Sequence, residues 1–161
     1  MTRHWLMKSE PEAYSIGDLR RDGSTFWNGV RNYQARNFMR DGMRPGDMVL
    51  FYHSSTEVPG VAGIARVSRA GYPDHTARDP QGEYYDPRAS DEDPRWYMVD
   101  IEFVEAFPEV VPLDTLRRTP GLEEMPLVNR SRLSVQPVTP EEFRIILGLA
   151  RKQEGPRQDP P

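Results

Sequence analysis

The segment Phe26–Asn37 (FWNGVRNYQARN) concentrates side chains of the kinds that bind nucleic acids. Aromatic faces stack on bases, and each stacked base contributes about 1–3 kcal/mol. Asparagine and arginine read base edges through paired hydrogen bonds, and the start of a helix offers free backbone amides to a phosphate. An alternative interpretation assigns Phe26 and Trp27 to the core and leaves Asn32 as a helix cap only. The residue types alone leave both interpretations open.

Two other polar groups stand where an apolar run ends. Residues 8–11 (KSEP) follow such a run, a placement that suits a binding loop or an ordinary surface turn. His53 and Ser54 end another run, and the pair suggests a hydrolase with His53 as general base. Adjacent strand residues point to opposite faces, however, and no G-x-S-x-G motif is present. We therefore favour hydrogen-bonding pocket walls for this pair and expect no catalytic residue.

Several classes of protein are excluded by composition or by missing motifs. The chain has no cysteine, so disulfide scaffolds and thiolate metal sites are ruled out. Its three histidines lack ligand spacing, and there is neither a P-loop nor a G-x-G-x-x-G motif. We expect no metal and no cofactor. No apolar run approaches the roughly 20 residues of a membrane helix, and no signal-peptide h-region is present, so a cytoplasmic location is expected.

The net charge of −4 is distributed unevenly along the chain. Residues 1–72 carry 10 basic and 7 acidic side chains, a net of +3, whereas residues 73–110 carry 3 and 11, a net of −8. A basic face can therefore coexist with the acidic total. Residues 71–95 contain four prolines and many acids, which predicts a long, solvated and mobile loop. An adaptor that binds a protein partner through this loop is an alternative function.

Periodicity predicts an interleaved series of short strands and helices. Strands are expected over 4–8, 48–53, 61–69, 96–107 and 133–138, and helices over 16–21, 32–41, 112–118 and 140–150. The strands and helices do not alternate regularly, which favours a mixed or antiparallel sheet, a small closed β-structure and peripheral helices over a doubly wound sheet. One domain over 3–150 is expected, with residues 151–161 as a disordered, proline-rich tail.

A series of short motifs then resembles, in order, the EVE-domain family, which includes the thymocyte nuclear protein-like proteins. The motifs are Trp5–Pro11, Trp27–Asn37, Phe51–Ser54, Gly60–Gly63, Ala70–Asp74, Tyr85–Pro87, Pro94–Trp96, Val99-Asp100 and Arg132–Pro137. Together they span about residues 4–150, nearly the whole expected folded unit. The resemblance implies an α+β, PUA-like fold, a mixed β pseudo-barrel with short flanking helices. It also implies a non-catalytic module that takes a modified base of DNA or RNA into an aromatic pocket. That base would be similar to methylated or hydroxymethylated cytosine. The oligomeric state is left open by the sequence, with a monomer favoured.

The resemblance also implies roles for particular side chains. Trp27 is expected to stack on the extruded base, Trp96 to close one side of the pocket, and Ser134 to lie near its rim. Base-edge hydrogen bonds are expected from Lys8, Ser9, Asn28, Asn32, His53 and Ser54. Phosphate contacts are expected from Arg31, Arg36 and Arg132. Family members often carry Asp where this chain has Asn28. An amide accepts through its carbonyl but loses the charge-assisted bond, so the ligand preference is expected to depend on this position.

Overall fold

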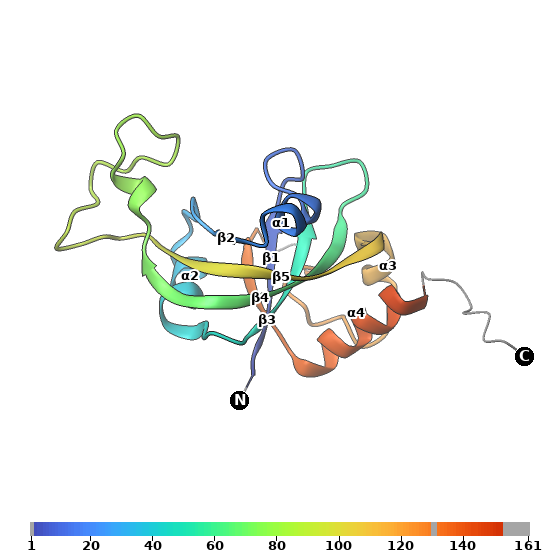
Figure 1. Ribbon diagram of the computed structural model, residues 1–161. Coiled ribbons are helices and arrows are strands. Elements are labelled where there is room, and N and C mark those ends of the chain that lie inside the picture. The colour runs from blue at the N-terminus through green and yellow to red at the C-terminus, as the bar shows by residue number, and fades with distance from the viewer. Residues whose placement is uncertain (1, 130–131, 153–161) are drawn as a thin grey trace, which may run out of the picture.

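The computed structural model describes residues 2–129 and 132–152, which form a six-stranded mixed sheet with helices on both faces (Figure 1). The strands are β1 (His4–Ser9), β2 (Ser24–Phe26), β3 (Met48–His53), β4 (Gly60–Pro73), β5 (Tyr97–Pro112) and β6 (Val135–Val138). The helices are α1 (Ile16–Asp22), α2 (Tyr33–Asn37), the π-helix η1 (Phe38–Gly42), the 3-10 helix η2 (His75–Arg78), α3 (Leu113–Arg117) and α4 (Pro140–Lys152). The predicted α+β class is confirmed.

The strand order β2-β5-β4-β3-β1-β6 brings distant motifs together. β1 runs parallel to β3, so that Ser9 pairs with His53, and β1 is antiparallel to β6. The polar residues that follow β1 and β3 therefore meet at one edge of the sheet, beside the start of β6. This is the only parallel pair among the described strands, and it makes the sheet mixed.

Two apolar cores lie on opposite faces of the sheet, because successive strand residues point to opposite sides. On β1, Trp5 and Met7 join one core and Leu6 joins the other, and β3 alternates in the same way. Helices α1 and α2 with η1 contribute to the first core, and α3 and α4 to the second (Figure 1). Burial on both faces explains why β1 and β3 read as continuous apolar runs.

The predicted helix starts are confirmed by their caps. Ser15 and Asp18 form a reciprocal capping box at α1, and Thr139 and Glu142 form another at α4. Asn32 caps α2 by accepting a hydrogen bond from the backbone N–H of Ala35. The helix predicted over 32–41 is interrupted, however. It passes from α2 into η1, whose last turn closes through the backbone N–H of residue 43 and the carbonyl of residue 38, 2.9 Å apart.

Several element boundaries differ from the prediction, and one strand was missed. β4 extends to Pro73 and is followed directly by η2, so regular structure enters the segment predicted as a loop. β5 runs to Pro112, beyond the predicted end at 107, and helix α4 runs to Lys152, beyond the predicted end at 150, while residues 153–161 lie outside the described residues. β2 was not predicted, because three residues are too few to show a period and its pairing partner β5 lies about 75 residues away in sequence.

The acidic segment is anchored rather than solvated throughout. Asp74 and Asp86 are buried, and Ala77 between them is fully buried. Trp96 donates its indole N–H to Asp86 at 2.8 Å, and the Arg88 backbone N–H donates to the same carboxylate at 2.9 Å. The segment projects from the body between β4 and β5 (Figure 1) but is held to it by these two carboxylates. Because buried carboxylates need partners, they mark its attachment points.

Because of the Asp86 carboxylate, we expect the unfolding free energy to fall in acid. The hydrogen bond from Trp96, together with those from Arg88, lowers the pKa of Asp86 from 3.8 to about 2. The unfolded chain therefore takes up the proton first, and the stability contributed by Asp86 is lost as the pH falls from about 4 to about 2. We expect Asp86→Asn to flatten the pH dependence of the unfolding free energy in this window, measured by urea denaturation. Asp91→Asn, at an exposed position, is the control, and equal curves for the two variants would contradict the assignment.

Candidate functional site

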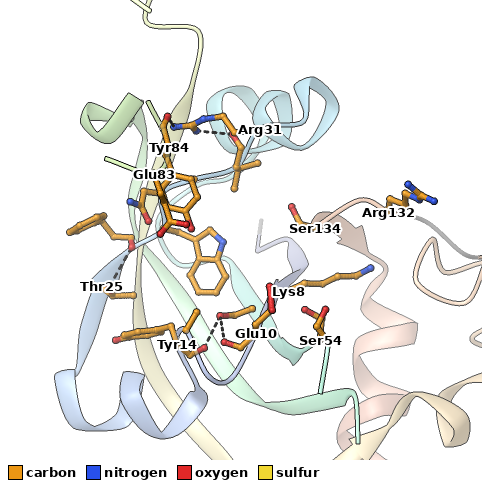
Figure 2. A pocket seen from close by; sticks show the side chains of 18 residues that line it. Lys8, Glu10, Tyr14, Thr25, Arg31, Ser54, Glu83, Tyr84, Arg132 and Ser134 are labelled. Carbon is orange, nitrogen blue, oxygen red and sulfur yellow. Dashed lines mark hydrogen bonds between the residues drawn. The ribbon is translucent and has the colours of Figure 1, made fainter. Parts of the chain in front are cut away.

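A cleft of about 770 Å³ opens where β1 and β3 end and the segment after β2 begins. It is lined by Lys8, Ser9, Glu10, Ala13, Tyr14, Thr25, Phe26, Trp27, Asn28, Gly29, Val30, Arg31, Ser54, Ser55, Glu83, Tyr84, Arg132 and Ser134. Figure 2 shows Lys8, Ser54, Arg132 and Ser134 on one side, and Tyr14, Thr25, Arg31, Glu83 and Tyr84 on the other. The volume lies in the range of small-ligand pockets.

The polar side of the cleft is built by backbone pairing of three neighbouring strands. The Ser54 N–H donates to the Ser9 carbonyl at 2.9 Å, and the Lys8 N–H donates to the Ser134 carbonyl at 2.9 Å. The ends of β1 and β3 and the residue before β6 are thereby set side by side. Three hydroxyls and one ammonium group converge there, a concentration of hydrogen-bonding groups that suits a polar ligand edge.

Trp27 is the central aromatic wall. Its backbone N–H donates to the Val99 carbonyl at 2.8 Å, and its ring packs edge-on against Phe51, 5.5 Å away with the planes at 88°. The residue is only 9% exposed, yet it lines the cleft. The two interpretations of this residue are therefore compatible, because Trp27 belongs to the core and also forms part of the cleft surface. Packing holds the indole rigid, which lowers the entropic cost of stacking a ligand on it.

Asp74 holds the loop 28–31 against the end of β4. Its side chain is fully buried and accepts the backbone N–H of Gly29 at 2.9 Å and the Arg31 guanidinium at 3.1 Å. It also accepts the backbone N–H and the hydroxyl of Thr76. Arg31 donates further to the Tyr84 carbonyl at 2.8 Å, so the acidic segment and the 28–31 loop are tied together. One buried carboxylate thus positions a whole wall of the cleft.

The sequence of this chain matches a known protein family over nearly its whole length. The EVE domain family model matches residues 3–149. This chain belongs to the EVE domain family. Thymocyte nuclear protein 1 of Homo sapiens is 42% identical over 95% of this chain and 76% of the relative.

Solved structures agree. A hypothetical protein from Leishmania major has a TM-score of 0.92 at 47% identity, covering 96% of this chain and 98% of that one. Human THYN1, solved in complex with 5-methylcytosine containing DNA, has a TM-score of 0.88 at 42% identity, covering 94% and 99%. The predicted α+β, PUA-like fold of the EVE domain is therefore confirmed for this chain.

The EVE domain brings most of the predicted site residues together and leaves four outside. The cleft is lined by Lys8, Ser9, Trp27, Asn28, Arg31, Ser54, Arg132 and Ser134. Asn32 instead caps α2, and Arg36 donates to the Arg95 carbonyl at 2.8 Å while its guanidinium lies over the Tyr33 ring. Neither side chain lines the cleft, and the roles expected of Asn32 toward a base edge and of Arg36 toward a phosphate stay predictions.

His53 and Trp96 are also structural residues in this EVE domain. The Nε2 atom of His53 accepts the Ile16 backbone N–H at 3.1 Å, and burial lowers the pKa of this imidazole. Trp96 stacks on Tyr33, with ring centroids 4.8 Å apart, and donates to Asp86. Both side chains make hydrogen bonds or ring contacts within the fold, and the residue types alone do not indicate these partners. Neither residue lines the cleft, and the roles expected of His53 toward a base edge and of Trp96 as a pocket wall stay predictions.

The remaining cleft residues were not predicted as site residues. They are Glu10, Ala13, Tyr14, Thr25, Phe26, Gly29, Val30, Ser55, Glu83 and Tyr84. Glu10, Phe26, Gly29 and Val30 fall inside motifs that were singled out, so adjacency was an available signal. Tyr84 lies in the acidic segment, outside these motifs, and is held at the cleft by partners more than 50 residues away in sequence, Gly29 and Arg31.

The charges of the cleft are mixed. Lys8 and Arg132 contribute positive charge to its lining, and Glu10 and Glu83 contribute negative charge. Burial lowers the pKa of Lys8. In the described part of the chain Arg132 has no ion-pair partner, whereas Arg31 is paired with Asp74. Residues 2–129 and 132–152 contain no group of three or more His, Asp or Glu side chains that would hold a metal ion. Within the same ranges no helix is long and apolar enough to cross a membrane.

Gly29 allows Tyr84 to close against the loop, which yields a second stability prediction. Gly29 has φ +81°, and a Cβ there would lie 2.6 Å from the Tyr84 ring. We expect Gly29→Ala to lower the unfolding free energy by about 1–3 kcal/mol more than backbone strain alone, because the ring must shift. Gly23→Ala is a matched control, since Gly23 also has φ +81° but nothing within 4 Å of its Cβ position. Equal losses of unfolding free energy for Gly29→Ala and Gly23→Ala, measured by urea denaturation, would show that the Tyr84 ring moves aside without cost.

Proposed function

We propose that this EVE domain binds DNA carrying a modified cytosine and holds the modified base in the cleft. The observation that carries the proposal is Trp27, an indole held by the core and presented to a cleft of about 770 Å³. A rigid aromatic surface beside convergent hydrogen-bonding groups suits a flat, polar-edged ligand. The human relative solved with 5-methylcytosine containing DNA supports the same ligand class at 42% identity.

The chemistry of the walls supports a base rather than an apolar ligand. Ser54 and Ser134 offer hydroxyl donors and acceptors for base edges. The Ser9 hydroxyl, which donates to the Tyr14 carbonyl at 2.6 Å, offers an acceptor, and Asn28 offers its amide. Val30 and the Trp27 ring offer apolar contact for a methyl substituent. A methyl group in such a pocket discriminates by about 1–3 kcal/mol, so we expect a clear but moderate preference for the methylated base.

Binding without catalysis is the favoured mode. The general base of the alternative hydrolase interpretation, His53, has its Nε2 lone pair engaged by Ile16, and the imidazole does not line the cleft. A general base must reach the proton that it removes. The geometry therefore supports a module that recognises a base and leaves it chemically unchanged.

The direct test is binding of short strands of one sequence, each with a single central cytosine or 5-methylcytosine, in DNA and RNA forms. Fluorescence anisotropy at low and moderate salt measures Kd. We expect tighter binding of the methylated DNA strand, and weaker binding as salt rises, because released counterions contribute to affinity. Equal weak binding of every strand would contradict the proposal and point to a smaller ligand for the cleft.

Arg132 supplies a prediction about salt. It lies at the rim without an ion-pair partner in the described residues, so we expect it to neutralise one phosphate. Arg132→Ala should reduce the slope of log K against log salt by about 0.7 for single strands and weaken methylated and unmethylated strands alike. Arg144→Ala on α4, away from the cleft, is the control and should leave the slope unchanged. A change in methyl preference would instead place Arg132 on the base.

A further inference from the structure

Both oxygens of the Asp74 carboxylate accept two hydrogen bonds each. An ionised carboxylate offers about four lone-pair sites, two on each oxygen. Oδ2 accepts from the Gly29 N–H at 2.9 Å and from Arg31 at 3.1 Å. Oδ1 accepts from the Thr76 N–H at 2.8 Å and faces the Thr76 hydroxyl at hydrogen-bond distance. All four sites are occupied, so the proton between Asp74 and the Thr76 hydroxyl must belong to Thr76.

This direction of donation determines how the Asn28 amide must lie. A hydroxyl has one proton, and that of Thr76 is used toward Asp74, so its oxygen can only accept from other neighbours. Asn28 lies 3.2 Å from this oxygen and must therefore present its NH₂ group, Nδ2, to it. Thr76 is not a cleft wall, whereas Asn28 is. One N–H of Nδ2 is thereby committed to Thr76, and the acceptor that the amide offers to a ligand in the cleft is its carbonyl oxygen, Oδ1.

We propose that Asp74 and Thr76 act as a relay that holds Asn28 as a hydrogen-bond acceptor, and that this relay selects bases with an exocyclic amine over those with a carbonyl. Thr76 is then a positioning residue that sets specificity without touching the ligand. This inference rests on the proposed function of the cleft. It assigns to the cleft a selectivity that differs from recognition of the methyl group.

The relay would distinguish 5-methylcytosine from thymine, two bases that a pocket shaped for the methyl group accepts equally well. Thymine and 5-methylcytosine carry the same ring methyl group, and they differ where cytosine has the N4 amine donor and thymine has the O4 acceptor. An apolar pocket for the methyl group accepts both bases. An amide free to rotate would also accept both, since it could turn its NH₂ group toward O4. An amide held by Thr76 faces O4 with a second acceptor, which is repulsive.

The test uses four single-stranded DNA oligonucleotides of one sequence, with a central cytosine, 5-methylcytosine, uracil or thymine. The ratio of Kd for thymine to Kd for 5-methylcytosine measures amine selection, and the ratio of cytosine to 5-methylcytosine measures methyl selection. We expect the wild type to favour 5-methylcytosine over thymine by about tenfold or more, the scale of a well-placed base contact. Uracil against cytosine should show the same amine selection without the methyl group.

Thr76→Val removes the hydroxyl with little change of shape and lets the amide turn. We expect amine selection to fall about tenfold, mainly through tighter thymine binding, while methyl selection persists. Thr76→Ser retains the hydroxyl and should retain selection. In the Asn28→Asp background both side-chain oxygens accept, so Thr76→Val should no longer change amine selection. Thr76→Ala provides the same test if the valine variant does not fold.

The outcomes separate this inference from the proposed function. Equal weakening of all four strands by Thr76→Val would mean a merely structural role and would overturn the relay. A wild type that prefers methylated over unmethylated cytosine but binds thymine equally well would overturn the relay and leave the proposed function standing. A wild type without methyl preference would refute the proposed function and, with it, the relay.

Discussion

Trp27→Ala is expected to remove base recognition, the largest change in binding that a single substitution should produce in this protein. Loss of one stacked base corresponds to about 1–3 kcal/mol, or between about fivefold and 150-fold in Kd. Because Trp27 also packs against Phe51, truncation should cost the fold about 3–5 kcal/mol as well. Fluorescence anisotropy with the methylated and unmethylated strands measures the first effect, and urea denaturation measures the second.

Trp27→Phe separates the two effects, because phenylalanine retains an aromatic ring in the core and offers less surface to the base. The matched control is Trp96→Phe, the same chemical change at a buried indole that stacks on Tyr33 outside the cleft. We expect the change at 27 to weaken binding of the methylated strand and the change at 96 to leave it near wild type. Equal affinities for the two folded variants would remove Trp27 from the binding surface.

Asp74→Ala is expected to produce a large loss of stability, on the scale of that of Trp27→Ala. The substitution leaves Arg31, whose side chain is 24% exposed, without its carboxylate, and strips the Gly29 and Thr76 backbone N–H groups of their acceptor. Removing one partner of a buried ion pair costs about 3–5 kcal/mol. For a chain of this size that is a drop in Tm of roughly 6–20 °C, measured by thermal unfolding with circular dichroism.

The control for this prediction is Asp41→Ala. Asp41 also pairs with an arginine, Arg40, at 2.8 Å, but its side chain is 60% exposed. Exposed pairs contribute about 0–1 kcal/mol, so Tm should change by only a few degrees. If Asp74→Ala melted like Asp41→Ala, the buried carboxylate would not organise the 28–31 loop. Asp74→Asn, which keeps the shape but loses the charge, should fall between the two.

Features that depend on neighbours in sequence were predicted well. The helices predicted to begin at 16 and 140 do begin there. Their caps Ser15 and Thr139, like Asn32 at α2, each accept an N–H group three residues along the chain, so the signal for a helix start is local. The run 48–53 matched β3 at both ends, since a strand buried on both faces is apolar throughout. Glycine within a strand is typical of a close approach of two backbones, and a Cβ at Gly63 in β4 would lie 2.3 Å from the Glu105 carbonyl oxygen.

Features that depend on distant partners were predicted poorly. His53 and Asn32 are residue types that can bind a base edge. Each instead accepts a hydrogen bond from a backbone N–H, that of Ile16 for His53 and that of Ala35 for Asn32. Whether a polar side chain serves a ligand or the fold depends on which donor lies within about 3 Å, and sequence spacing does not report that. Tyr84 shows the reverse case, a residue without any local signal that becomes a cleft wall.

By itself, the sequence determined the α+β class, most of the strands and helices, the membership of the EVE domain family and the motifs from which the cleft is built. Local propensity, capping and side-chain periodicity are enough for these. Only the tertiary structure decided which polar groups remain available to a ligand. The physical reason is that the Asp74 carboxylate, Thr76 and Asn28 are brought together from positions up to 48 residues apart, from Asn28 to Thr76. Their hydrogen bonds are assigned only once every donor in the buried cluster has been matched to an acceptor.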